Sequence, residues 1–179
     1  MSKDIPNTSD FFDLGKTAYS QYFQGLKHPW EILEKIPDIV TENITTTIRG
    51  NVSDDAVIGN RVQIGKETVV EPGATIKGPA IIGSNCEIRS GAYIRTDVAI
   101  GNGVTIGHST ELKRSLIHDE AEIPHFSYVG DSVLGAHSNF GAGTVVANLR
   151  HDDENVEMMV KGELVDTGRR KLGIVAADG

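Results

Sequence analysis

The sequence predicts an all-β fold, a left-handed parallel β-helix of hexapeptide repeats, with a short helical segment at the N-terminus. The main observation is an aliphatic residue at every sixth position: Val52, Ile58, Ile64, Val70, Ile76, Ile82, Ile88, Ile94, Ile100, Ile106 and Leu112. The residue four positions after each is usually small, as at Ala56, Ala74 and Ala92. Glycine often follows the aliphatic residue directly, as at Gly59 and Gly65.

A repeat of six residues suits neither an amphipathic helix, whose period is about 3.6, nor a half-buried strand, whose period is about 2. It suits a solenoid in which each hexapeptide forms one side of a triangular coil, so that three of them complete 18 residues. The aliphatic residue fills the interior, and glycine, asparagine or aspartate takes the turn. An ordinary β-sandwich would need irregular spacing and alternating polarity, so we do not expect one.

The composition narrows the class of protein. A chain of 179 residues holds one domain, or one domain with an appendage. Its formal net charge of −8 argues against a general nucleic-acid or membrane-surface binder. Cys86 is the only cysteine, so no intrachain disulfide can form. Because no apolar run resembles a signal peptide or could span a bilayer, we expect a cytoplasmic protein.

Residues 1–43 read as a polar tail followed by a helical cap. The tail covers about residues 1–8, and the apolar residues then follow helical spacing, with Ser9 in the position of an N-cap. Pro29 suits the first turn of another short helix, which Pro37 interrupts or ends. We expect this segment to cover the open first coil and hide its strand edges, and docking of a partner protein is the alternative.

The β-helix is expected to span residues 44–179. Its repeat keeps one phase at first and then twice shortens from six residues to five, from Leu112 to Ile117 and from Val129 to Leu134. Counted through both shortened steps, the repeat comprises 17 hexapeptide units, nearly six coils. The shortened steps lie beside the most unusual polar residues of the chain.

The repeat is suspended at about residues 149–173. This charged stretch holds two short apolar runs around Lys161-Gly162-Glu163, a pattern that predicts a hairpin-like excursion. Solenoids accommodate such insertions at corners, often on the binding face. The final residues 176–179 resemble the start of a new repeat, so we expect the chain to be a shortened form that lacks further coils.

The coil length also predicts which polar side chains stack. Lys77, Arg95 and Lys113 are 18 residues apart, so they project from equivalent places on successive coils. Cations about 5 Å apart repel each other. We therefore expect a phosphate ligand beside Arg95 and Lys113, whereas Lys77 is expected to extend into solvent.

Five more polar residues gather near this column. With the shortened step included, His125 stands one coil above His108, and Tyr128 stands one coil above Glu111. Glu111 is therefore near enough to orient or charge-stabilise the His125 imidazole. Asn139 lies shortly above. We expect the other histidines to be solvated surface residues: His28, His118, His137 and His151.

Three sequence blocks resemble a known family. They are IPHFSYVGD at 123–131, NFGAGT at 139–144, and Ala147-Asn148. They strongly resemble the acetyltransferase domain of the bifunctional N-acetylglucosamine-1-phosphate uridyltransferase/glucosamine-1-phosphate acetyltransferase and related sugar-phosphate nucleotidyltransferase proteins. The resemblance covers residues 52–179. It implies a homotrimer that transfers an acetyl group from acetyl-CoA to an amino-sugar 1-phosphate without a metal.

The resemblance also implies a role for each matching residue. His125 would be the general base that deprotonates the sugar amine before it attacks the thioester, and Glu111 would support that histidine. Asn148 would position or polarise the thioester. The other matches would hold the sugar phosphate or, for the last, contact the acyl-CoA through the backbone: Arg95, Lys113, Tyr128, Asn139 and Ala142.

The sequence departs from the family at several positions. Leu149 stands where a tyrosine is common, and the acidic run Asp152-Asp153-Glu154 replaces an expected lysine unless Lys161 or the basic cluster 169–171 substitutes for it. The later coils that usually bind the CoA tail are not in the sequence. There is also no glycine-rich nucleotide loop of the usual kind and no αβ alternation, so we do not expect uridyl transfer from these residues.

Three alternative functions can be compared with the same residues. A non-catalytic trimeric scaffold or sugar-phosphate-binding module would keep the polar column without using acetyl-CoA, as Glu154 would favour. An O-acetyltransferase stays open, because a histidine base can also activate a hydroxyl. A γ-class carbonic anhydrase would need two histidines five residues apart, and no such pair exists here, so we expect no zinc. The sequence does not distinguish glucosamine from galactosamine.

Overall fold

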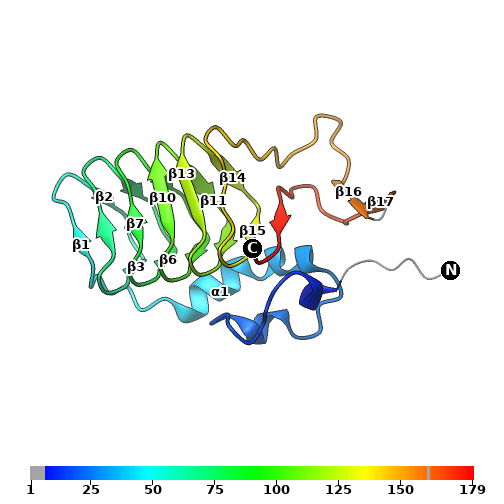
Figure 1. The fold of residues 1–179 in the computed structure, drawn as a ribbon, viewed down its shortest axis with the longest axis horizontal. Coiled ribbons are helices and arrows are strands. Elements are labelled where there is room, and N and C mark those ends of the chain that lie inside the picture. The colour runs from blue at the N-terminus through cyan, green and yellow to red at the C-terminus, as the bar shows by residue number, and fades with distance from the viewer. Residues whose placement is uncertain (1–6, 161) are drawn as a thin grey trace.

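A parallel β-solenoid dominates the computed structural model, which describes residues 7–160 and 162–179. Three parallel sheets wrap around one apolar interior, so the predicted left-handed β-helix is confirmed. Figure 1 shows helical turns along one side of this prism and a small hairpin beyond its last coils. Expectations for residues 1–6 and for Lys161 lie outside the described residues. Within the part described, no helix is long and apolar enough to cross a membrane.

Successive strands pass to successive sheets, so every third strand pairs in parallel within one sheet. Sheet 1 contains β1 (Asn51–Val52), β4 (Val69–Val70), β7 (Glu87–Ile88), β10 (Thr105–His108) and β13 (Glu122–His125). Sheet 2 contains β2 (Val57–Ile58), β5 (Thr75–Ile76), β8 (Tyr93–Ile94), β11 (Glu111–Lys113) and β14 (Tyr128–Gly130). Sheet 3 contains β3 (Val62–Ile64), β6 (Ala80–Ile82), β9 (Val98–Ile100), β12 (Ser115–Ile117), β15 (Val133–Leu134) and β18 (Val175–Ala176).

The sixth-position aliphatic residues stack inside the prism as predicted. On sheet 2, Ile58 pairs with Ile76, which pairs with Ile94 on the next coil. Nearly all of these residues from Ile64 to Leu112 are almost completely buried in one continuous cluster. The shortened step is visible in the register, because Ile117 pairs with Ile100, 17 residues earlier. The interior repeat therefore sets the strand pairing, and a coil loses one residue at a corner without breaking it.

The N-terminal segment consists mainly of 3-10 turns. They are η1 (Thr8–Asp10), η2 (Ser20–Phe23) and η3 (Pro29–Glu34), followed by the helix α1 (Ile36–Asn43). Asn7, not Ser9, is the N-cap of η1. Pro29 occupies the first turn of η3, as expected. η3 ends at Glu34, shortly before Pro37, so the expected interruption is present, but Pro37 itself lies in the first turn of the next helix, α1, where a missing N–H costs nothing.

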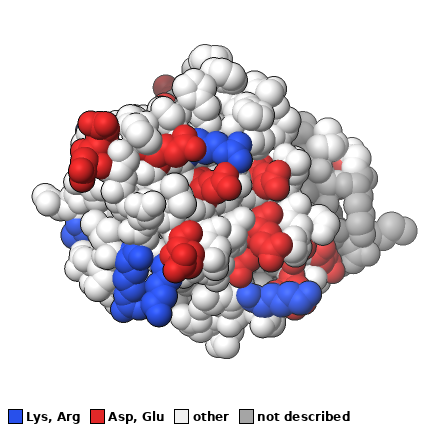
Figure 2. Space-filling model, turned by 60° about the vertical axis from the view of Figure 1, so that its left-hand side comes forward, with Lys and Arg blue, Asp and Glu red and all other residues white. Residues whose placement is uncertain are grey.

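The segment does not cover the open first coil, so the expectation of a lid is wrong. Its apolar side chains pack instead on the outer face of sheet 3, in one cluster with Ile81, Ala99, Leu116 and Val133. These outward positions are apolar and need covering, whereas the end at β1 and β2 carries charged side chains, as Figure 2 shows. Charged groups protect an exposed strand edge from pairing, so that end needs no lid.

The predicted hairpin is present in the 149–173 excursion. β16 (Glu157–Val160) and β17 (Glu163–Asp166) pair antiparallel. Val156, Met158 and Val165 pack against the same cluster as the helical turns, so the excursion rests on the helical segment and on sheet 3. The chain then rejoins the prism, where β18 pairs with β15.

Candidate active site

The predicted stacking of polar residues on sheet 2 is present. Glu111 pairs with Tyr93 on the coil below and with Tyr128 on the coil above. The backbone N–H of Lys77 bonds to Ile94 and that of Arg95 to Leu112, so each cation of the column stands one coil below the next. Lys77 lies 6.0 Å from the centre of the Tyr93 ring, a contact that the repeat spacing does not predict.

Glu111 contacts Arg95 rather than His125. The Arg95 guanidinium donates a hydrogen bond of 2.9 Å to Oε1 of Glu111, and both side chains are partly exposed. This bond raises the pKa of Arg95 above its ordinary value. Among the described residues, neither a hydrogen bond nor an ion pair joins Glu111 to His125. The expected support of the histidine is therefore not formed within one chain, because a cation on the same sheet face is closer.

Lys113, Tyr128 and Asn148 converge at the upper end of sheet 2. Nζ of Lys113 lies 3.9 Å from the carboxylate of Asp131, which also accepts a 2.5 Å hydrogen bond from Nδ2 of Asn148. A Cβ at Gly130 would lie 2.6 Å from Oη of Tyr128 and 2.8 Å from Nδ2 of Asn148. The missing side chain of Gly130 thus leaves the space that the tyrosine hydroxyl and the asparagine amide occupy.

His125 lies at the corner between sheets 1 and 2. It ends β13 and pairs in register with His108, as predicted from the coil length. Its side chain is exposed, and so is that of the next residue, Phe126, whose backbone is left-handed with φ of 46°. Nδ1 of His108 lies 2.6 Å from the carbonyl oxygen of Ser90, which fixes the lower imidazole. The upper imidazole is left accessible to a ligand.

Asn139 and Ala142 lie one coil above His125 and are exposed. Asn139 forms a parallel bridge with Glu122, the first residue of β13. The N–H of Gly143, which follows Ala142, bonds to the carbonyl oxygen of His125 at 3.2 Å. Ala142 therefore belongs to the same corner as the histidine, whereas Asn139 lies at the other end of β13, separated from that corner by the width of sheet 1.

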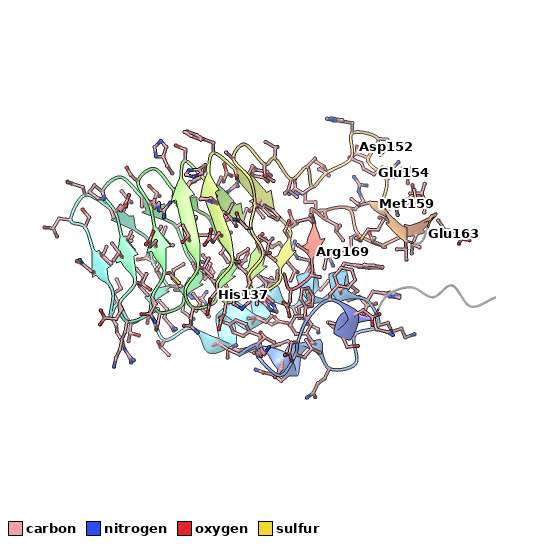
Figure 3. All side chains as sticks on the ribbon, in the orientation of Figure 1. His137, Asp152, Glu154, Met159, Glu163 and Arg169 are labelled. Carbon is pink, nitrogen blue, oxygen red and sulfur yellow. The ribbon has the colours of Figure 1, made fainter. Side chains whose placement is uncertain are left out.

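The basic residues of the excursion are engaged elsewhere. Nη1 of Arg169 lies 3.0 Å from Glu34 of η3, and Arg170 bonds to Asp153 at 2.6 Å. Figure 3 shows Arg169 beside the helical turns, and Asp152 and Glu154 in the outer loop. Burial lowers the pKa of the Arg169 guanidinium. Arg169 and Arg170 are therefore held by acidic partners, whereas Lys171 is exposed and pairs through its backbone with Leu149. The expectation for Lys161 lies outside the described residues.

The expectation that the remaining histidines are solvated is wrong for His118 and only partly right for His28, which is half-buried and stacked on Trp30 with ring centres 4.7 Å apart. His118 is buried, not solvated, and its ring stands 5.1 Å from that of Phe12 and 6.0 Å from that of Phe23. Burial lowers its pKa, opposed by the charges of Asp178 and Asp119. His118 follows Ile117 on sheet 3, so the helical segment covers it. The hydrophobic pattern of residues 9–40 gave no indication of which face would be covered.

The structure adds Asp131, Arg114 and Tyr93 to the predicted residues. Asp131 was part of a quoted motif, but nothing in its spacing indicated that its carboxylate would be 1% exposed. No group of three or more histidine, cysteine, aspartate or glutamate side chains that could hold a metal ion occurs in the described part of the chain. The site can therefore offer a base, a pair of cations and an amide to a bound molecule.

Comparison with curated proteins identifies several relatives. A bifunctional sugar-1-phosphate nucleotidylyltransferase/acetyltransferase from Sulfurisphaera tokodaii is 39% identical over 155 residues, 87% of this chain. The bifunctional protein GlmU of Methanocaldococcus jannaschii is 38% identical over 157 residues, 88% of this chain. The chain spans only 39% and 38% of the length of these two relatives. Their names agree with the resemblance found in the sequence, which is confirmed.

Solved structures show a weaker likeness. A perosamine N-acetyltransferase from Caulobacter crescentus has 15% identity and a TM-score of 0.34, over 57% of this chain and 53% of that one. This overlap supports no functional assignment. The family model of the GMPPB C-terminal domain, in contrast, matches residues 76–171. Because that match covers more than half of the chain and most of the polar column, the chain belongs to the GMPPB C-terminal domain family.

Proposed function

We propose that the chain is an acetyl-CoA-dependent N-acetyltransferase acting on an amino-sugar 1-phosphate, with His125 as the general base. The observation that carries the proposal is the pair of cations, Arg95 and Lys113, on coils next to an exposed histidine. A sugar phosphate carries an anion and an amine a few bonds apart, which suits such a pair. The acetyltransferase activity in the name of the Sulfurisphaera tokodaii relative supports the same reaction.

The chemistry assigns a task to each group. A protonated amine is not a nucleophile, so the neutral imidazole of His125 first removes a proton. The amine nitrogen then forms a bond to the thioester carbonyl carbon, and the carbon–sulfur bond breaks. The departing thiolate takes the proton from the imidazolium, and the second proton that the nitrogen loses on becoming an amide is released to solvent. Arg95 and Lys113 hold the phosphate, Tyr128 lies beside them, and Asn148 orients the acetyl group, so the reacting atoms stay aligned.

A homotrimer completes the proposed site. Sheet 3 is covered by the chain's own helical segment, so sheets 1 and 2 and their shared corner are the faces left for association. Phe126 is 60% exposed and Val145 is 72% exposed beside this corner. Exposed apolar groups next to a polar site are typical of interfaces. In such an assembly Arg95 and Lys113 of one prism would serve His125 of its neighbour, with the sugar phosphate in the cleft.

A non-catalytic sugar-phosphate-binding scaffold is the second candidate. The observation in its favour is the acidic loop, in which Arg150 is bound by Asp152 and Glu157 and offers no free cation to acetyl-CoA. Such a protein would bind the sugar phosphate through Arg95 and Lys113 without releasing CoA.

The test is release of free CoA thiol from acetyl-CoA with glucosamine 1-phosphate or galactosamine 1-phosphate. His125→Ala should lower turnover by about 100- to 10,000-fold, the usual contribution of a general base. His137→Ala is the matched control, because that exposed imidazole pairs with Glu120 at the corner between sheets 3 and 1, away from the proposed site. Full turnover in His125→Ala would contradict the assigned base. Sugar-phosphate binding without turnover in the unaltered protein would favour the scaffold.

A further inference from the structure

The carboxylate of Asp131 is a buried charge that the proposed reaction does not use. It follows β14 at the corner between sheets 2 and 3, where its backbone is left-handed with φ of 49°. The side chain is 1% exposed. Burying a carboxylate costs free energy unless donors and cations compensate it, so its position requires a physical explanation.

The compensation comes from residues of the proposed site. Nδ2 of Asn148 donates to Oδ2 at 2.5 Å, and Nζ of Lys113 lies 3.9 Å from the same oxygen. Nη1 of Arg114 lies 3.9 Å from Oδ1, which accepts no hydrogen bond within the described chain. Two of the four residues at this corner, Lys113 and Asn148, are thus the residues assigned to the sugar phosphate and the acetyl group.

This contact leaves the Asn148 amide only one orientation. An anionic carboxylate only accepts hydrogen bonds, so the amide must present its NH2 group to Asp131 and direct its oxygen away. The backbone is also fixed, because the N–H of Leu172 bonds to the carbonyl oxygen of Asn148 at 3.1 Å. The N–H of Gly173 bonds likewise to the carbonyl oxygen of Asp131 at 2.8 Å. The chain returning from the excursion therefore ties both residues together.

We propose that Asp131 is a positioning residue for acetyl transfer, which fixes the Asn148 amide in one orientation and holds the Lys113 ammonium at the same corner. The inference rests on the proposed function and deepens it. An amide free to flip would present its oxygen and its NH2 group to the acetyl donor alternately. A fixed one is oriented before the substrates arrive, which removes the cost of ordering it in the transition state.

The first test compares Asp131→Asn with Asp97→Asn. Asparagine tolerates the left-handed backbone, so neither change strains its corner. Asp97 has φ of 58° at the same prism edge on an earlier coil and no contact with Asn148. We expect Asp131→Asn to lower kcat by about 10- to 100-fold, the range for a misplaced reacting group. The KM for sugar phosphate should not rise, because Lys113 keeps its charge. Asp97→Asn should match the unaltered protein in both constants.

A purely structural role makes a different prediction. It would lower the melting temperature and leave kcat of the folded enzyme unchanged, and that result would overturn the proposal. The double variant Asp131→Asn/Asn148→Ala gives a second criterion. If Asp131 acts through Asn148, the double variant is no slower than Asn148→Ala alone. If the fold-losses of kcat in the two single variants multiply in the double variant, the two residues act independently, and that result would also overturn the proposal.

A measurement without turnover separates this inference from the proposed function. The side-chain amide protons of Asn148, identified by their absence in Asn148→Ala, are followed by NMR hydrogen exchange in the unaltered trimer or monomer. Slow exchange is expected, because one proton is held by a buried carboxylate. Fast exchange would refute the orientation even in an active enzyme. If no amino-sugar phosphate is acetylated, slow exchange still supports the contact while the proposed reaction fails.

Discussion

Sheets 2 and 3 share one interior and differ chiefly on their outer faces. Inside the prism both present the same ladder of buried isoleucine and leucine side chains. Outside, sheet 3 carries Ile81, Ala99, Leu116 and Val133, and the helical segment covers them. The outer face of sheet 2 instead carries the tyrosines and charged residues of the candidate site and is left uncovered by its own chain.

This difference shows that the inward and outward sides of each strand have separate functions. The inward residue of a hexapeptide sets the coil, since its burial removes apolar surface from water whichever sheet it belongs to. The outward residue decides whether that sheet becomes a packing surface or remains available for a ligand. Figure 1 shows the result, with helical turns along one side of the prism only. Substitutions at outward positions should therefore affect stability on sheet 3 and activity on sheet 2.

The largest effect on stability is expected from Leu116→Ala on sheet 3. Leu116 is fully buried beneath the helical segment, and truncating such a residue typically costs about 2–5 kcal/mol of unfolding free energy. Val57→Ala is the matched change on sheet 2, where the side chain is 61% exposed, and should cost less than about 0.5 kcal/mol. Trp30, the only tryptophan, is buried in the same cluster as Leu116, so its fluorescence reports both transitions. Equal losses would remove the distinction between the sheets.

The next effect concerns ligand binding on sheet 2. Arg95→Ala and Lys113→Ala should each raise the KM for sugar phosphate by about 10- to 100-fold, as expected for a lost charge-assisted hydrogen bond. Both changes also remove a cation from a neighbouring carboxylate, Glu111 in Arg95→Ala and Asp131 in Lys113→Ala. Lys77→Ala removes a cation of the same column on an earlier coil and should leave KM unchanged. A comparable rise in Lys77→Ala would mean that the whole column, and not its upper part, binds the anion.

The smallest effect is a pH dependence of the sheet 3 contact. His118 is buried beneath Phe12 and Phe23, and its pKa is lowered by burial. The folded state therefore binds fewer protons than the unfolded state. Stability is full above the unfolded pKa of about 6.5 and is lost as the pH falls toward the lowered folded value. One such group changes stability by at most about 1.4 kcal/mol per pH unit.

Urea unfolding at several pH values, followed by Trp30 fluorescence, measures this dependence. His118→Phe should reduce the loss of stability on acidification, because phenylalanine fills the aromatic site without titrating. His137→Phe provides the comparison, since the His137 side chain is 61% exposed. If His118→Phe leaves the pH dependence unchanged, other groups are responsible, and the nearest are the Asp119 and Asp178 carboxylates.

Several site relations could be predicted because the coil length is nearly constant. The stacking of His125 on His108 and of Tyr128 on Glu111 follows from counting residues through one shortened step. The ion pair between Glu111 and Arg95 could not be predicted by counting residues, because it depends on which side chain contacts the Glu111 carboxylate. The burial of Asp131 depends on residues 172–173, which return from an excursion whose path no repeat describes.

By itself the sequence determined the prism, its strand register and the column of polar residues, because a strict period of six admits one way to bury the aliphatic residues. Only the tertiary structure decided where the helical segment lies, that His118 is buried, and that Asp131 holds Asn148. The physical reason is that these contacts join elements far apart in the chain. Their choice among available faces is settled by complementary shape and charge, which a local repeat does not encode.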